Sequence, residues 1–231
     1  MLTLITMTGN RPEAWKLCEH FMERQNFQGL VHWIIVDDGK VAQPITFHRE
    51  GWTLEIIRPE PFWQAGQNTQ TRNIRAALEV VTPADRIAFI EDDDWYSPSW
   101  LAIMDEQLNE ADLVGERLAF YYNLKNQQYC QLSNGSHSGL CSTGIKGQAI
   151  DILKKICQVD RQFIDIELWK APISRRLFTS KEVIGMKGLP GRGGIGMGHK
   201  PQRAFKSDFS GDVLRKMIGK DADLYFNLKL N

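Results

Sequence analysis

The sequence predicts an α/β protein with a mostly parallel central sheet, followed by a smaller region of mixed structure. In the first half of the chain, short apolar runs alternate with segments of helical periodicity, a pattern typical of βαβ units. The runs end at turn residues or at acids. A chain of 231 residues, with 42% hydrophobic and 24% charged residues, suits one globular domain.

The elements of the first half follow in order. The apolar run 2–7 predicts a strand, and Pro12 in the next turn suits the first position of a helix over 12–25. Further runs predict strands at 31–36, 53–57 and 87–90, with a mostly helical segment at 66–81 between the last two. Right-handed crossovers would place the carboxyl ends of these strands on one rim.

The second half is less regular. We expect a helix at 98–109, a strand at 118–122 that turns at Asn126-Gln127 into 129–132, a polar loop at 134–142 and a helix at 147–157. Segment 185–200 has seven glycines and predicts a loop. The break near 113–120 divides the single domain into two halves, 1–112 and 113–231.

Four consecutive acids, Glu91 to Asp94, follow the apolar run 87–90. In open α/β sheets, ligands bind at this end of the strands. Adjacent carboxylates repel each other, and they stay ionised at low cost only if a cation lies among them. Mg²⁺ and Mn²⁺ prefer such oxygen ligands. The cluster therefore indicates a divalent cation and a phosphate-bearing substrate. The alternative is a solvated acidic turn before the helix that begins near Pro98.

Composition limits the other possibilities. The formal net charge is zero, so no overall positive field favours nucleic acid. The four cysteines, at 18, 130, 141 and 157, lack zinc-ligand spacing, which indicates reduced thiols and a cytoplasmic protein. The segment 1–7 is a strand without the features of a signal peptide, and no apolar stretch is long enough to span a membrane.

Six segments in order resemble the GT-A glycosyltransferases, and specifically the large inverting type called family two. They are 4–11, 36–39, 66–73, 90–94 with Pro98, 142–146 and 164–169. The resemblance implies a Rossmann-like GT-A fold and an inverting, metal-dependent transfer of a sugar from a nucleotide-sugar, taken as a UDP-sugar, to an acceptor hydroxyl. Residues 1–112 would bind the nucleotide-sugar and 113–231 the acceptor.

The resemblance also implies roles for individual residues. Asp165 would be the catalytic base. The donor would be held by Thr8, Asn10, Arg11, Asp37, Asp38, Arg72, Asp92 and Arg192. The metal, Mn²⁺ or Mg²⁺, would be held by Asp93, Asp94, Glu91 and His199. Two departures from the family pattern are Glu91, where the metal motif usually begins with Asp, and Ile164, where an acid usually precedes the base.

The residues themselves leave alternatives. Asp165 could cap a helix, Asp37 and Asp38 could belong to a tight turn, and Arg72 could be a surface arginine. The glycine-rich segment could be a spacer, although its cations favour a loop that closes over the donor. Trp95 follows the acids directly and is the aromatic residue that we expect at the site.

Two other functions share these features. A nucleotidyltransferase would use the same acids, but it usually has a glycine-rich basic segment after the first strand, where this chain has only Thr8 to Pro12. A non-catalytic nucleotide-binding domain would keep the fold without turnover. For a glycosyltransferase, the acceptor could be a glycan, a protein or a hydroxymethylated DNA base. The last rests on a basic cluster of Lys187, Arg192, Lys200, Arg203 and Lys206.

Overall fold

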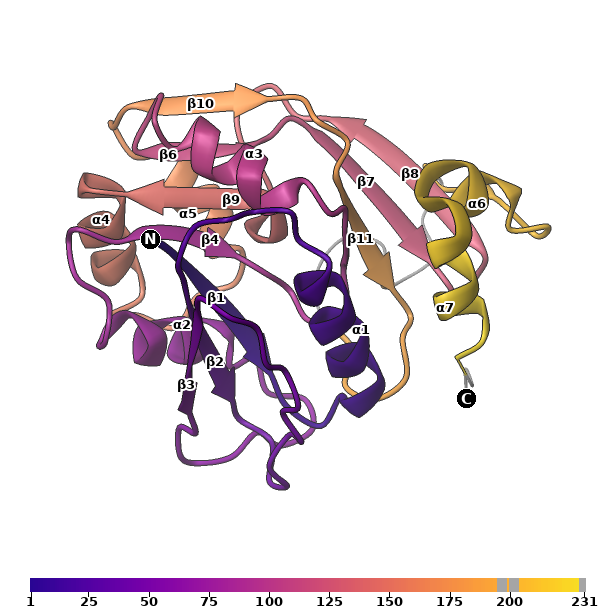
Figure 1. The fold of residues 1–231 in the computed structure, drawn as a ribbon, viewed down its shortest axis with the longest axis horizontal. Helices are drawn as coiled ribbons and strands as arrows, with labels where there is room; N and C mark the ends of the chain where they lie inside the picture. Colours follow the sequence, from indigo (N-terminus) through magenta and orange to yellow (C-terminus); the bar gives the residue numbers. More distant parts are fainter. Residues whose placement is uncertain (195–198, 200–203, 229–231) are drawn as a thin grey trace.

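The computed structural model describes residues 1–194, 199 and 204–228. Its main sheet has seven strands in the order β10-β6-β9-β4-β1-β2-β3 (Figure 1). Their bounds are β1 Leu2–Thr8, β2 Val31–Asp37, β3 Trp52–Ile57, β4 Arg86–Phe89, β6 Leu113–Glu116, β9 Thr143–Lys146 and β10 Arg175–Phe178. All neighbouring pairs are parallel except the two that involve β9. The predicted mostly parallel α/β sheet is therefore confirmed.

A second sheet lies beside the first and has the order β12-β8-β7-β11-β5. It consists of β5 Trp95–Tyr96, β7 Leu118–Asn123, β8 Gln128–Ser133, β11 Val183–Lys187 and β12 Lys206–Ser207. The hairpin expected at Asn126-Gln127 joins β7 and β8, with Asn123 opposite Gln128. Helices α6 Asp212–Ile218 and α7 Ala222–Phe226 flank this sheet at its outer side (Figure 1).

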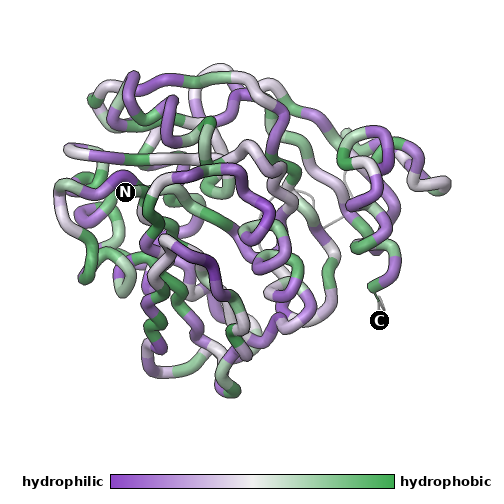
Figure 2. Tube along the Cα trace, viewed as in Figure 1, coloured by the Kyte–Doolittle hydropathy of each residue, from purple (hydrophilic) through white to green (hydrophobic). Residues whose placement is uncertain are grey.

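Helices cover both faces of the main sheet because successive residues of its strands point to opposite sides. Leu2 and Leu4 of β1 pack in the core that includes α1 Pro12–Glu23 and α3 Trp100–Gln107. Ile5 packs in a second core, with α2 Gln70–Leu78, α4 Gln148–Ile156 and α5 Ile164–Trp169. Hydrophobic residues accordingly concentrate along the inner strands in Figure 2. All four cysteines are buried and free.

Two expected element bounds were wrong. The helix expected from Gly66 begins only at Gln70, because Gly66 has φ +87 and so belongs to a turn. The loop expected from Gly185 begins later, since Val183–Lys187 is strand β11. None of the described helices is long and apolar enough to cross a membrane.

The parallel strands bring distant residues to one rim. Thr8 at the end of β1 is in register with Asp37 at the end of β2. The Thr8 hydroxyl also donates to Asp92 Oδ2 at 2.7 Å, just beyond β4. This rim is therefore where the acidic cluster and the first two βα turns meet.

Candidate functional site

A cavity of about 390 Å³ opens at this rim. One part of its lining consists of polar and charged side chains from the rim, from the end of β11 and from the segment after β11: Thr8, Arg11, Glu91, Asp92, Asp93, Lys187, Arg192 and His199. Another part comes from the β7–β8 hairpin, the loop that follows it and the start of α5: Tyr121, Leu132, Asn134, His137, Leu140, Phe163, Asp165 and Ile166. The cavity thus joins four of the eight predicted donor-binding residues, Thr8, Arg11, Asp92 and Arg192, to the predicted base.

Arg11 is the main counter-ion of the acids that face the cavity. Its Nη1 donates to Asp92 Oδ1 at 2.7 Å, and its Nη2 donates to Asp93. Although burial alone would raise the pKa of Asp93, Arg11 and then Lys187 bring that pKa below its ordinary value. Asp93 is therefore ionised, and it lines the cavity.

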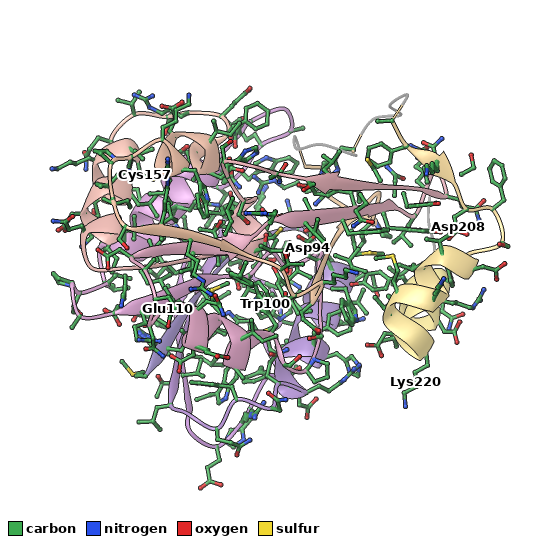
Figure 3. The ribbon with its side chains drawn as sticks, turned by 90° about the horizontal axis from the view of Figure 1, so that it is seen from above. Asp94, Trp100, Glu110, Cys157, Asp208 and Lys220 are labelled. Atoms are coloured by element: carbon green, nitrogen blue, oxygen red, sulfur yellow. The ribbon has the colours of Figure 1, made fainter. Side chains whose placement is uncertain are left out.

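Asp94 points the other way, into the protein, and lies centrally in Figure 3. Its side chain is fully buried and its Oδ1 accepts the Met186 amide at 2.8 Å. Lys187 Nζ lies 3.4 Å from the same oxygen and 3.9 Å from Glu91 Oε2. The other carboxylate oxygen of Asp94, Oδ2, is buried near the Cys141 thiol. Burial and neighbouring carboxylates raise the pKa of Asp94 to about 6 and that of Glu91 to about 8.

Replacing Asp94 with alanine should destabilise the fold. Loss of this carboxylate removes the nearest counter-ion of the buried Lys187 ammonium and leaves it with the more distant Glu91 and Asp93, and breaking a buried pair costs about 3–5 kcal/mol. Urea unfolding measures this loss. As the matched control, Asp105→Ala removes a partly exposed carboxylate that pairs with Arg86, and should cost no more than about 1 kcal/mol. Equal losses in the two variants would contradict the structural role of Asp94.

Asp38 lies outside the cavity lining, in a network that the glycine-rich segment reaches. Its Oδ1 accepts Arg192 Nη1 at 2.7 Å. Its Oδ2 accepts Asn73 Nδ2 at 2.8 Å, Arg72 Nη2 at 3.3 Å and the Thr69 hydroxyl. The Arg192 guanidinium lies over the Trp63 ring, 4.7 Å from its centroid. Arg192 is thus held against the turn after β2 and the loop between β3 and α2.

Asp37 is the turn acid of this rim. Its carboxylate is buried and accepts the Gly39 amide at 2.9 Å and the Gln43 amide at 2.8 Å. Arg58 Nε lies 3.3 Å from it. The tight Asp-Gly turn considered as an alternative is therefore present at Asp37, whereas Asp38 carries the contacts toward Arg192.

Asp165 lies in the first turn of α5 and lines the cavity. The residue at the N-cap position is Phe163, and no side chain caps the helix. Burial raises the pKa of Asp165, an effect only partly offset by backbone hydrogen bonds and by His137 nearby. A carboxylate with a raised pKa at a cavity wall can accept a proton.

His199 also lines the cavity, and burial together with Lys187 lowers its pKa to about 4. A neutral imidazole offers a lone pair, so the cavity wall presents the carboxylate oxygens of Glu91, Asp92 and Asp93 and one nitrogen, ligand types that suit Mn²⁺. Within the described residues, ligand atoms of Glu91, Asp94 and Cys141 lie within 4.8 Å of one another. This trio contains Cys141 and the inward-facing Asp94 instead of Asp93 and His199, so it differs from the predicted ligand set, whereas the acids and the imidazole on the cavity wall fit a divalent cation.

The remaining predicted residues lie away from the cavity lining. Arg72 binds Asp38 and the Pro61 carbonyl, and Asn10 is an exposed turn residue with φ 56. Trp95 is 7% exposed and donates from Nε1 to Asp221 at 2.9 Å, so it packs in the core. Of the basic cluster, Lys200 and Arg203 lie outside the described residues.

Among the cavity residues that sequence reasoning missed are Lys187 as a buried counter-ion, and Tyr121, Phe163 and Ile166 on its wall. Lys187 lies 5.9 Å from the Tyr121 ring centroid, besides its contacts with the acids. Phe163 and Ile166 bracket Asp165 in sequence, and that proximity is the signal that could have identified them.

The two sheets and the helices around them form a fold of the GT-A type. Two crystal structures of Staphylococcus aureus TarS, a glycosyltransferase of this type, are similar to it. One aligns with a TM-score of 0.56 at 12% identity and covers 81% of this chain and 37% of that chain. The other, TarS 1–349 in complex with UDP-GlcNAc, has the same TM-score and identity and covers 100% of this chain and 68% of that chain.

The sequence comparisons add nothing to this, since no family model and no curated protein matches the chain. At this level of identity the structural likeness concerns the fold. The chain spans 37% of the length of the longer TarS structure. What the chain does must therefore be argued from its own residues.

Proposed function

We propose that the chain is an inverting glycosyltransferase that moves a sugar from a UDP-sugar to an acceptor hydroxyl with Mn²⁺ or Mg²⁺. One observation carries the proposal: Asp165 and the charged group of Arg11, Asp92 and Asp93 line the same cavity. A similar TarS structure holds UDP-GlcNAc, which supports a UDP-sugar as the donor.

Residues of the chain would divide the reaction between them. Asp165 accepts the proton of the attacking hydroxyl, which approaches the anomeric carbon opposite the leaving nucleotide. Arg11 and Lys187 bring positive charge to the part of the cavity where the diphosphate would lie. A divalent cation held by Asp93, Glu91 and His199, which line the cavity, would supply further charge neutralisation for the leaving group, whereas Asp94 turns inward to the Met186 amide.

In this assignment residues 1–112 provide most of the donor site, and 113–231 provide the base and the acceptor wall. The donor site also takes Lys187, Arg192 and His199 from the second half. A nucleotidyltransferase would attack the α-phosphate instead, and the short turn after β1 offers no glycine-rich basic segment for that reaction. The acceptor is a glycan, a protein or a hydroxymethylated DNA base.

Melting temperatures with UDP, GDP, CDP and dTDP, each with Mn²⁺ or with EDTA, test the donor site. A ligand at a hundred times its Kd stabilises the fold by about 2.7 kcal/mol, which raises Tm by about 5–10 °C for a domain of this size. We expect this shift with UDP and Mn²⁺ and a smaller one in EDTA. Uridine, which lacks the diphosphate, is the control and should give no metal-dependent shift.

Absence of a shift with all four nucleotides would contradict the proposal. A shift with UDP but no release of UDP from UDP-GlcNAc or UDP-glucose, even in single-turnover reactions, would favour the non-catalytic alternative.

A further inference from the structure

Phe163 is an aromatic residue in an unusual position. It is 46% exposed and lines the cavity two residues before Asp165. Its backbone has φ 57 and ψ 51, the left-handed region, at the N-cap of α5. A bulky residue rarely adopts this conformation, because its Cβ then approaches the carbonyl oxygen that follows. Glycine or asparagine would satisfy the same backbone without strain.

Packing does not account for a phenylalanine at this position. In the part of the chain that the structure describes, Phe163 makes no ring–ring contact and belongs to neither core cluster. Strained residues that persist without structural benefit occur mostly at functional sites. The ring is therefore better explained by a ligand in the cavity than by the fold.

The surroundings indicate what kind of ligand that is. Ile166, 37% exposed, lies on the other side of Asp165 in sequence and lines the same cavity, as do Leu132 and Tyr121. A hydroxyl that Asp165 deprotonates must belong to a group seated among these side chains. Aromatic and aliphatic surfaces bind flat apolar rings by stacking and by exclusion of water.

We propose that Phe163 determines acceptor specificity by stacking on a flat ring that carries the accepting hydroxyl through a methylene group, so that the acceptor is an arylmethyl or heteroarylmethyl alcohol. This inference rests on the proposed function. In the step, the alcohol oxygen forms a bond to the anomeric carbon and its proton passes to Asp165. The bond from that carbon to the diphosphate breaks, and its electron pair leaves with UDP.

Phe163→Gly separates this role from a structural one. Glycine relieves the left-handed strain, so the variant should melt about 2–4 °C above the wild-type protein. Its KM for the ring alcohol should nevertheless rise by about ten- to a hundredfold, the usual effect of losing a stacking partner. A residue that only supports the fold would lower Tm when removed and leave KM unchanged.

The assay uses UDP-glucose and UDP-GlcNAc as donors and three alcohols as probes. Benzyl alcohol is the aryl acceptor, 5-hydroxymethyluracil is the heteroaryl acceptor, and cyclohexylmethanol is a saturated ring of similar size. We expect transfer to one or both flat rings and poor transfer to the saturated one. Transfer to benzyl alcohol would identify a carbocyclic ring, and transfer to 5-hydroxymethyluracil would identify a nucleobase-like ring. Phe163→Tyr should keep the wild-type KM, because tyrosine presents the same face.

Phe209→Ala is the matched control, since Phe209 is 75% exposed and lies outside the cavity lining. The inference is overturned if cyclohexylmethanol serves as well as benzyl alcohol, if Phe163→Gly keeps the wild-type KM, or if neither flat ring accepts sugar. The Tm shift with UDP and Mn²⁺, measured in every variant, separates these outcomes from failure of the proposed function, in which that shift itself is missing.

Discussion

The variant Asp165→Asn should lose about 10²- to 10⁴-fold in kcat while it keeps its affinity for UDP, because asparagine retains the shape of the side chain but cannot accept a proton. Asp165 suits the role of base since burial raises its pKa and its carboxylate lines the cavity. Single-turnover release of UDP from UDP-GlcNAc, with water as the acceptor, measures the effect without a known acceptor.

Glu167→Gln is the control for this variant. Glu167 lies in the same helix, but it pairs with Lys170 at 2.8 Å on the surface and does not line the cavity. Its loss should leave kcat nearly unchanged. Asp165→Asn with wild-type kcat would remove Asp165 from the reaction and would leave the donor site as proposed.

The second large effect is expected for Asp93→Asn, which should weaken the metal-dependent binding of UDP by about a hundredfold or more. Asp93 is the ionised acid of the cluster that faces the cavity, and removal of its charge leaves a divalent cation with fewer anionic ligands. At fixed UDP and Mn²⁺, two orders of magnitude in affinity correspond to about 2.7 kcal/mol of lost stabilisation. The difference in Tm between Mn²⁺ and EDTA reports this loss.

The side chain of Asp93 can be changed without disturbing the fold greatly, because Arg11 keeps its contact with Asp92. Glu110→Gln removes one negative charge from an exposed side chain that pairs with Arg176 at 3.1 Å, and should not alter the shift. An unchanged metal-dependent shift in Asp93→Asn would show that the cation, if it binds, uses other ligands.

The four strands β1 to β4 of the main sheet could be predicted because their pattern is local, whereas β6, β9 and β10 were not predicted. Apolar runs that end at Thr8, Asp37 and Glu91 place their last residues on one rim once the strands are parallel, and no tertiary detail is needed for that. Strand β11 could not be predicted, because Gly185 and its glycine neighbours indicate a loop. Position 185 of this strand requires glycine, because a Cβ built there would lie only 2.5 Å from the Tyr121 ring.

The residue types of the candidate site could be predicted, but the directions in which their side chains point could not. The sequence shows four acids in a row but not that Asp93 faces the cavity while Asp94 turns inward to the Met186 amide. Lys187 was not identified as part of the site, since a buried ion pair between residues 94 and 187 depends on how β11 meets the acid turn. Such long-range partners have no signature in the local pattern.

The buried cysteines have a practical consequence for following this protein in solution. Burial raises the pKa of every thiol in the chain, so at neutral pH all four are protonated and react slowly with labelling reagents, including Cys141, which lines the cavity. Gly135 is exposed, and a Cβ placed there would meet no atom within 4 Å. Because Asn134 and His137 on either side line the cavity, a dye coupled to Gly135→Cys would report on occupancy of that wall without removal of any native cysteine.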